Sequence, residues 1–558
     1  PVLPVPKQFA PMLWLGLLGW LFAWAWMWPF ATVDGLSFLG LTHHQPAPWL
    51  QSICLVAALV TLLRATTTRS AFYLAWWFAT NWLLATNWWL TYSMTVYGGL
   101  PPALAALAVL ALSAALGLYM GVCMGMLANG GVWSRSRVAP VWRALAVMAA
   151  WVLAEWLRAK WLTGFPWGEV GYAHLATWGW LAPVVGSVGV GAAAVFICAW
   201  LAASIHQWTT TPRTRLMSMG PPLAGFALLL FGIPSDSRID PARWTQAAGV
   251  NQVALLQGNI GQAEKFGADA LPAMTWYTQT IAALPSATAD LVITPETAFP
   301  YTQNAIPANV WAGLQDASDA QDAALLLGLP TEKGRGKQVT FRNEAWALTP
   351  NESSDNAPGQ LPASAYRYAK THLVPFGELV PPGFQWFTDQ LSIPLTSFER
   401  GGLTQPTFDW RGQRHAVTIC YEDVFGDELA QRMLLSAQMP TAWINMSNLA
   451  WFGATTAVPA HLLMARWRAL ELGRPMLRAT NTGATAVIGY RGDVQAVLPF
   501  QSRGILRAPY EGREGVTPYV AWAGQWGHRP VWVLSLATLV LLQLVVRLWP
   551  LRGRDQRS

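Results

Sequence analysis

The stretch His415-Ala-Val-Thr-Ile-Cys420-Tyr-Glu-Asp-Val-Phe425 combines a short apolar run with a thiol at its end. The run predicts a β-strand, and we expect a sharp turn at Cys420 with a helix beginning near Asp427. Enzymes with α/β folds tend to place nucleophiles at the carboxyl edge of a sheet. Cys420 is therefore a candidate nucleophile, although a lone cysteine is more often buried and inert.

An α/β layered domain is predicted around this stretch. Short β-rich runs such as Val253–Gln257, Leu291–Thr294 and Ala442–Ile444 alternate with helical stretches such as Pro459–Leu472. Strands that alternate with helices indicate sheets covered by helical layers. We place this domain at residues 234–515.

The composition of the 558-residue chain indicates a membrane protein. Hydrophobic residues make up 53% of it and charged residues only 12%, about half the charged share of a soluble domain. The 34 tryptophans favour a membrane–water interface, because the indole ring is apolar and its N–H stays hydrated. The formal net charge of +7 does not indicate nucleic-acid binding, because much of it falls in short loops between apolar segments.

Eight apolar runs are long enough to cross about 30 Å of hydrocarbon. They lie near 10–30, 48–63, 71–91, 102–126, 141–157, 185–205, 216–233 and 530–549. We therefore expect a multi-span α-helical membrane domain of seven spans at residues 1–233. Residues 516–558 are expected to hold the eighth transmembrane helix and a tail.

The basic residues predict the orientation of these spans. Loops with Lys or Arg alternate with neutral loops, as the positive-inside rule requires for eight spans with both termini in the cytoplasm. The domain between spans seven and eight is then expected on the outer side of the membrane, which in a bacterium is the periplasm, without access to cytosolic ATP or nicotinamide. The charged loop 158–184 departs from the alternation, and Leu162–Gly168 within it is predicted to be an interfacial re-entrant or amphipathic piece.

Two charged residues can act together with Cys420. Glu296 follows the β-rich run Leu291–Thr294, and Lys370 lies in the run Tyr366–Glu378. A carboxylate can accept the thiol proton if burial raises its pKa, and an ammonium can hold the oxyanion that forms on an attacked carbonyl. Taken singly, the Glu is more often a solvated loop residue and the Lys a surface charge.

The other cysteines indicate no further chemistry. Cys54, Cys123 and Cys198 lie in apolar segments, where cysteine behaves as a small hydrophobe. No pair of cysteines has metal-ligand spacing, and the soluble part holds only Cys420. We expect no disulfide, no metal and no cofactor.

Several longer motifs narrow the interpretation. Glu296, Lys370 and Cys420 in their contexts resemble the Glu-Lys-Cys triad of the nitrilase superfamily. The longer motifs resemble those of the apolipoprotein N-acyltransferase family, which acylates lipoproteins at the bacterial inner membrane. They are Leu162-Thr-Gly-Phe-Pro-Trp167, Leu255-Leu-Gln-Gly-Asn-Ile260, Thr294-Pro-Glu-Thr-Ala298, Lys370-Thr-His-Leu-Val-Pro-Phe-Gly-Glu378, Ile419-Cys-Tyr-Glu422, Ser447-Asn-Leu-Ala-Trp-Phe-Gly453 and Arg466–Gly483.

The resemblance implies a fold and a reaction. The fold is a nitrilase-like αββα sandwich on an eight-helix membrane base. Cys420 attacks an acyl ester of a phospholipid, expected to be phosphatidylethanolamine, and the thioester then passes its acyl group to the α-amine of a diacylglyceryl apolipoprotein. Glu296 is implied as the base, with Lys370 and the N–H of Tyr421 as the oxyanion hole.

Further residues carry weaker implications. Glu378 and Glu422 match additional carboxylates of the family's site and would orient Lys370 or the substrate amine. For Glu422, a simple role at the start of a helix beside Asp423 stays open.

The comparison also gives lid and entrance candidates, and it shows three departures from the family pattern. Phe266 and Trp451 are lid or entrance candidates, and the Trp-rich loop Trp88–Tyr97 is a further part of the entrance. The family commonly has Pro at the position of Gly261 and Trp at that of Phe266. It usually has Asp where Leu449 stands here, so any support from that carboxylate is lost or relocated.

Two other functions remain possible at this point. A membrane-tethered nitrilase-type amidase would use the same triad with water in place of the amine, but it would have no need of an eight-span base. A non-enzymatic lipid-binding or transport protein would be expected to show ionisable residues inside its spans. Only Glu155 stands out, and it lies near a span end beside Arg158.

Overall fold

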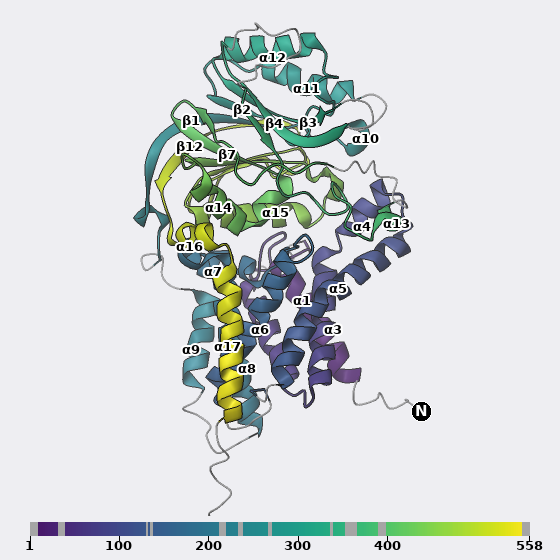
Figure 1. The fold of residues 1–558 in the computed structure, drawn as a ribbon, viewed down its shortest axis with the longest axis vertical. Coiled ribbons are helices and arrows are strands. Elements are labelled where there is room, and N and C mark those ends of the chain that lie inside the picture. Colours follow the sequence, from purple (N-terminus) through teal and green to yellow (C-terminus); the bar gives the residue numbers. More distant parts are fainter. Residues whose placement is uncertain are drawn as a thin grey trace, which may run out of the picture. The chain divides into compact units, whose positions relative to one another are not determined.

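The computed structural model describes residues 9–31, 39–129, 132–133, 138–210, 219–232, 238–265, 270–334, 339–351, 365–388 and 398–548. The chain forms two compact units (Figure 1). The helical unit comprises residues 1–91, 101–238 and 528–558, and the catalytic unit comprises 92–100 and 239–527. The catalytic unit therefore extends past the expected boundary at residue 515, because helix α16 (Pro518–Trp526) packs on α14 (Gly426–Leu435).

A helix lies at each of the eight positions where the sequence predicts a span. These helices are α1 (Phe9–Trp26), α2 (Pro48–Leu62), α3 (Thr68–Asn87), α5 (Pro102–Asn129), α6 (Pro140–Lys160), α8 (Ala182–Thr210), α9 (Gly220–Phe231) and α17 (Arg529–Leu548). Among the described residues, four helical segments are long and apolar enough to cross a membrane: those that contain α5, α6, α8 and α17. The helical unit is thus consistent with a membrane domain, and the count of eight spans stays a prediction.

The loop after α6 is held by the two charged residues at the end of that helix. Arg158 donates from Nη1 to the carbonyl of Phe165 at 2.9 Å and to that of Trp167 at 2.6 Å. The Glu155 carboxylate accepts the N–H of Val170 at 3.1 Å. Both side chains are buried, so they satisfy polar groups of an irregular loop. This structural role gives no support to ion-coupled transport.

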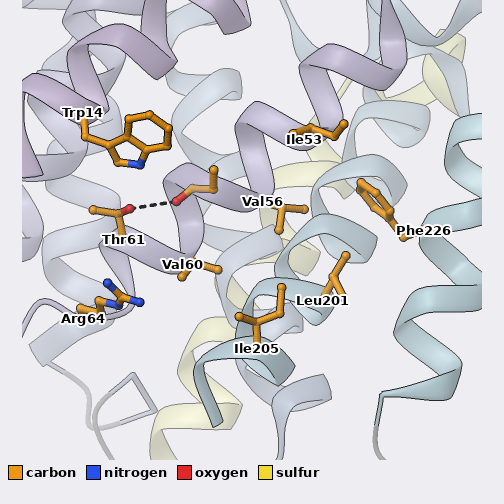
Figure 2. Close-up of a pocket in the computed structure, with 10 residues that line it drawn as sticks. Trp14, Ile53, Val56, Val60, Thr61, Arg64, Leu201, Ile205 and Phe226 are labelled. Carbon is orange, nitrogen blue, oxygen red and sulfur yellow. Dashed lines mark hydrogen bonds between the residues drawn. The ribbon is translucent and has the colours of Figure 1, made fainter. Parts of the chain in front are cut away.

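A cavity of about 390 Å³ lies on the helical unit (Figure 2). Apolar side chains from α1, α2, α8 and α9 line it, among them Trp14, Val60, Leu201 and Phe226, and Arg64 lies at one end. None of the predicted site residues lines this cavity. Its position therefore does not mark the catalytic centre.

Two six-stranded sheets form the middle of the catalytic unit. The first has the order β12-β1-β2-β3-β4-β5 and the second the order β11-β10-β9-β8-β7-β6. The strands are β1 (Thr245–Gln257), β2 (Leu291–Ile293), β3 (Ala324–Lys333), β4 (Thr340–Leu348), β5 (Arg367–Ala369), β6 (Phe408–Trp410), β7 (Gln413–Ile419), β8 (Ala442–Ser447), β9 (Met476–Thr480), β10 (Ala486–Ile488), β11 (Val494–Val497) and β12 (Gly504–Gly515). Strands β1, β2 and β3 are parallel to one another, and so are β7, β8 and β9.

The apolar runs of these strands are buried on both faces. In β1, Val253 and Leu255 belong to the core between the two sheets, while Ala254 and Leu256 pack toward α11 (Leu271–Ala282) and α12 (Ala308–Gln321). The outer face of the second sheet packs against α14, α15 (Ala457–Leu472) and α16. Figure 1 shows the helices on the two outer sides of the strands. The unit is therefore a helix–sheet–sheet–helix sandwich, the nitrilase-like arrangement expected from the sequence.

A buried histidine in the core between the sheets makes the fold sensitive to acid. His415 on β7 contacts the carbonyl of Phe408 at 3.0 Å and the hydroxyl of Tyr510 at 2.7 Å, and burial lowers its pKa from 6.5 to about 4. The folded state thus favours neutral imidazole. The stability that this provides is complete above the unfolded pKa of 6.5 and is lost as the pH falls toward about 4.

We expect the loss to reach about 3 kcal/mol of unfolding free energy at the acid end. Thermal unfolding of the full chain in detergent, followed between about pH 7 and pH 4, measures it. His415→Gln keeps a polar side chain that does not titrate, so its melting temperature should fall less over the same interval. An equal acid-induced fall in both proteins would contradict the assignment.

Candidate active site

The predicted site residues lie where strands end. Cys420 follows β7 directly, Lys370 follows β5 directly, and Glu296 follows β2 by three residues. Asn448 follows β8 directly. Glu296 and Lys370 follow strands of the first sheet, and Cys420 and Asn448 follow strands of the second sheet. The main-chain N–H of Asn448 bonds the Glu296 carboxylate, so the carboxyl ends of strands from both sheets meet at this site.

Lys370 joins the two carboxylates. Its ammonium lies 3.1 Å from Oε1 of Glu296 and 2.8 Å from Oε2 of Glu378. The Lys370 side chain is 1% exposed, and burial alone would favour its neutral form. The charges of Glu296 and Glu378 outweigh burial and hold the pKa of Lys370 well above its ordinary value. A fixed positive charge is therefore present at this sheet edge.

Two asparagines orient the Glu296 carboxylate. The side chain of Asn343, on β4, donates to Oε1 of Glu296 at 2.7 Å and to Oε1 of Glu378 at 2.9 Å. The main-chain N–H of Asn448 donates to Oε2 of Glu296 at 2.9 Å. Both carboxylate oxygens of Glu296 therefore have fixed partners, which leaves the base little rotational freedom.

The backbone around Glu296 is tightly constrained. Thr297, the next residue, has a φ of 45°, in the left-handed region that side chains with branched Cβ atoms rarely adopt. A Cβ at Gly328, on the neighbouring strand β3, would lie 2.3 Å from the carbonyl oxygen of Pro295. Strain of this kind costs on the order of 1–3 kcal/mol and gathers at functional sites.

Cys420 also has a left-handed backbone, with a φ of 53°. Its carbonyl accepts the side-chain amide of Asn445 at 3.1 Å, and the residue as a whole is half-buried. Burial raises the pKa of the thiol, the Glu296 carboxylate raises it further, and Lys370 acts in the opposite direction. The resting sulfur is thus a thiol that needs a base, not a preformed thiolate.

Glu422 does not contact the side chain of Lys370. Its carboxylate accepts the main-chain N–H groups of Thr371, His372 and Ile419, the last at 2.6 Å. The Tyr368 hydroxyl also donates to it at 2.9 Å. Burial raises the pKa of this carboxyl. Glu422 therefore fixes the backbone after Lys370 to the backbone before Cys420, whereas Glu378 is the carboxylate that contacts Lys370 itself.

The remaining candidates lie in different surroundings. The ring of Tyr421 packs edge-on against Phe425. Trp451 lies in the short helix η9 (Leu449–Phe452), and its ring meets that of Tyr97 at 5.2 Å. The Tyr97 hydroxyl donates to the carbonyl of Ala450 at 3.3 Å. Phe266, by contrast, lies outside the described residues.

The departures at Gly261 and Leu449 have simple environments. A Cβ at Gly261 would meet nothing within 4 Å, so the position has room for the proline that is common in the family. Leu449 is buried, with 2% of its surface exposed. An apolar side chain fits that position.

Three residues at the site were not identified from the sequence. Asn343 lies on β4 between Arg342 and Glu344, and Asn448 lies inside the motif Ser447–Gly453. Lys265 follows the motif Leu255–Ile260, and its Nζ donates to the carbonyl of Glu296 at 2.8 Å. The motifs pointed to two of the three segments, but no pattern specified which side chains face Glu296.

The fold and this site define the class of protein. Residues 252–511 match the family described as Carbon-nitrogen hydrolase. Residues 35–200 match the Apolipoprotein N-acyltransferase N-terminal domain. Among solved structures, an amidase from Nesterenkonia sp. AN1 aligns with a TM-score of 0.35 and 17% identity, over 50% of this chain and 99% of that chain.

Relatives that match most of the chain identify the family. An apolipoprotein N-acyltransferase from Verminephrobacter eiseniae is 40% identical over 90% of this chain and 94% of the relative. Another, from Ralstonia nicotianae, is 38% identical over 92% of each chain. The chain belongs to the apolipoprotein N-acyltransferase family.

Proposed function

We propose that the protein transfers a fatty acyl chain from a phospholipid to the α-amine of the N-terminal diacylglyceryl-cysteine of apolipoproteins. The observation that carries the proposal is the contact of Lys370 with Glu296, whose charges act on the thiol of Cys420, in a chain that matches this family over most of its length. Phosphatidylethanolamine is the proposed donor.

In the first half-reaction the Cys420 thiol gives its proton to Glu296, and the sulfur attacks the ester carbonyl of the phospholipid. The Lys370 ammonium and the N–H of Tyr421 hold the oxyanion. When the tetrahedral intermediate collapses, the C–O bond breaks. The lysophospholipid then leaves as an alcohol, with the proton returned by Glu296. The acyl group stays on Cys420 as a thioester.

In the second half-reaction the lipoprotein amine attacks the thioester. Glu296 accepts a proton from the amine, the C–S bond breaks, and the sulfur is reprotonated as the amide leaves. The thioester retains the free energy of acyl transfer, so neither ATP nor another cofactor is required. Glu378 keeps Lys370 in place during both steps, as its 2.8 Å contact supports.

The membrane arrangement is part of the proposal. Eight spans with both termini in the cytoplasm would place the catalytic unit in the periplasm, next to the leaflet that holds both lipid substrates. Segment 92–100 groups with the catalytic unit and contacts η9 through Tyr97, close to Asn448 and Glu296. This contact supports a role for Tyr97 and Trp451 at the substrate entrance.

A paired-substrate assay tests the function. Purified protein in detergent receives a fluorescent phosphatidylethanolamine and a diacylated lipopeptide. We expect lysophospholipid and triacylated peptide to appear in equal amounts. Lysophospholipid that accumulates with free fatty acid and without triacylated peptide would overturn the proposal and favour a hydrolase instead.

A further inference from the structure

A second buried lysine lies beside the triad. Lys265 ends the short helix α10 (Gln262–Lys265), and only 2% of its surface is exposed. Its ammonium donates to the main-chain carbonyl of Glu296 at 2.8 Å. Burial of a charged lysine lowers the stability of the fold unless other groups compensate the charge. The burial of Lys265 therefore suggests a specific role for it.

The loop that carries Lys265 is fixed by the same residues that orient Glu296. The side chain of Asn481 accepts the N–H of Ile260 at 3.0 Å and donates to its carbonyl at 2.7 Å. The Asn448 side chain donates to Gln262 at 3.2 Å, while its main-chain N–H holds Glu296. Lys265, Asn448 and Glu296 therefore form one connected assembly.

Lys265 brings a second ammonium to a site in which carboxylates outnumber Lys370. Glu296 and Glu378 bring two carboxylates, and Lys370 brings one ammonium. The charged groups that act on Lys265 are Glu296 and Cys420. Burial lowers the pKa of Lys265 to about 7, and those two groups partly oppose the fall. The Lys265 ammonium, held on the carbonyl of Glu296, thus interacts electrostatically with the Cys420 thiol, on which Glu296, Glu378, Asp423 and Lys370 also act.

We propose that Lys265 is a positioning residue for the acyl transfer, which holds the main chain of Glu296 and whose ammonium favours the thiolate form of Cys420. This inference rests on the proposed roles of Glu296 and Cys420. If Lys265 served only as a hydrogen-bond donor to Glu296, glutamine could replace it without any effect on the ionisation of the thiol.

Alkylation of Cys420 in the absence of lipid tests this. Full-length protein in detergent is treated with iodoacetamide from about pH 6 to pH 9, and peptide mass spectrometry follows modification at Cys420. We compare wild type with Lys265→Gln, Lys265→Met and Lys265→Arg, and with Lys333→Gln as the control, since Lys333 is exposed on the same unit. The thermal midpoint of each variant is recorded.

Near pH 6, we expect Lys265→Gln and Lys265→Met to alkylate about tenfold more slowly than wild type, because a nearby cation lowers a thiol pKa by about one unit or more. The difference should shrink as the pH rises through about 7, where wild-type Lys265 loses its own proton. Lys265→Arg should stay close to wild type at low pH, and Lys333→Gln should match wild type throughout.

Equal alkylation profiles for wild type and Lys265→Gln would overturn the inference, and a fall in thermal midpoint alone would assign Lys265 a purely structural role. If Lys265→Met does not fold, the alkylation profiles of Lys265→Gln and Lys265→Arg still test the proposal. The outcome is separate from that of the proposed function. If the alkylation profile shifts in Lys265→Gln but the wild-type protein forms no thioester from phospholipid, the proposed role of Lys265 stands and the proposed acyl transfer is rejected.

Discussion

In the Cys420→Ala variant, we expect no acyl-enzyme and a loss of acyl transfer of about four orders of magnitude or more, as for the loss of other catalytic nucleophiles. Among the described residues, Cys420 is the one cysteine of the catalytic unit, and the charges of Glu296 and Lys370 act on its thiol. No neighbouring side chain can supply an equivalent sulfur. Intact-protein mass spectrometry after incubation with phospholipid alone should show the added acyl mass in wild type only.

The matched control is Cys123→Ala. Cys123 is buried in α5 of the helical unit, so its replacement should leave both the acyl adduct and the transfer rate unchanged. The small cavity that it creates affects stability only modestly. An acyl adduct that persists in Cys420→Ala and disappears in Cys123→Ala would reverse the assignment of the nucleophile.

The Lys370→Met variant should lose both activity and stability. Removing the ammonium leaves the carboxylates of Glu296 and Glu378 buried at the same site without the cation that both contact. Loss of one partner from a buried ion pair typically costs about 3–5 kcal/mol, and loss of an oxyanion donor lowers the rate by about 100- to 1,000-fold. Thermal unfolding and the paired-substrate assay measure the two effects separately.

A second substitution separates the loss of stability from the loss of activity. In Lys370→Met/Glu378→Gln one of the two uncompensated carboxylates is neutral, so much of the lost stability should return. The rate should remain low, because the oxyanion still lacks its cation. Lys333→Met, on an exposed lysine, serves as the control and should change neither property. An unchanged thermal midpoint in Lys370→Met would contradict the electrostatic account of the site.

The sequence predicted the architecture of the site better than its details. Apolar runs that end in Glu296 and Cys420 indicated residues at the edge of a sheet, because strand periodicity and burial are local properties of the chain. The partners of those residues are not local. Asn343 and Asn448 reach Glu296 from strands that neither motif spacing nor composition could place in register. The resemblance suggested contact of Glu422 with Lys370 or the amine, whereas its carboxylate binds main-chain N–H groups.

The domain boundaries also depend on contacts that the sequence alone does not reveal. The low charge of residues 1–233 correctly suggested a helical unit, since hydropathy is summed over long windows. Segment 92–100 nevertheless groups with the catalytic unit, through the contact of Tyr97 with Ala450 and Trp451. A short aromatic loop has the same composition whichever unit it packs against. Only tertiary contacts distinguish the two cases.

The bonds of Glu422 have a consequence for how such a chain can change over evolutionary time. One carboxylate fastens the loop at Thr371 to the end of β7 at Ile419, so the separation of Lys370 from Cys420 is set locally and not by the intervening polypeptide. Insertions and deletions between residues 379 and 398, outside the stretches that bind Lys370 through Glu378 and Gly401, can then accumulate without altering the spacing of the oxyanion clamp and the nucleophile. The segment most open to divergence in length thus lies directly between two of the residues that must stay in register.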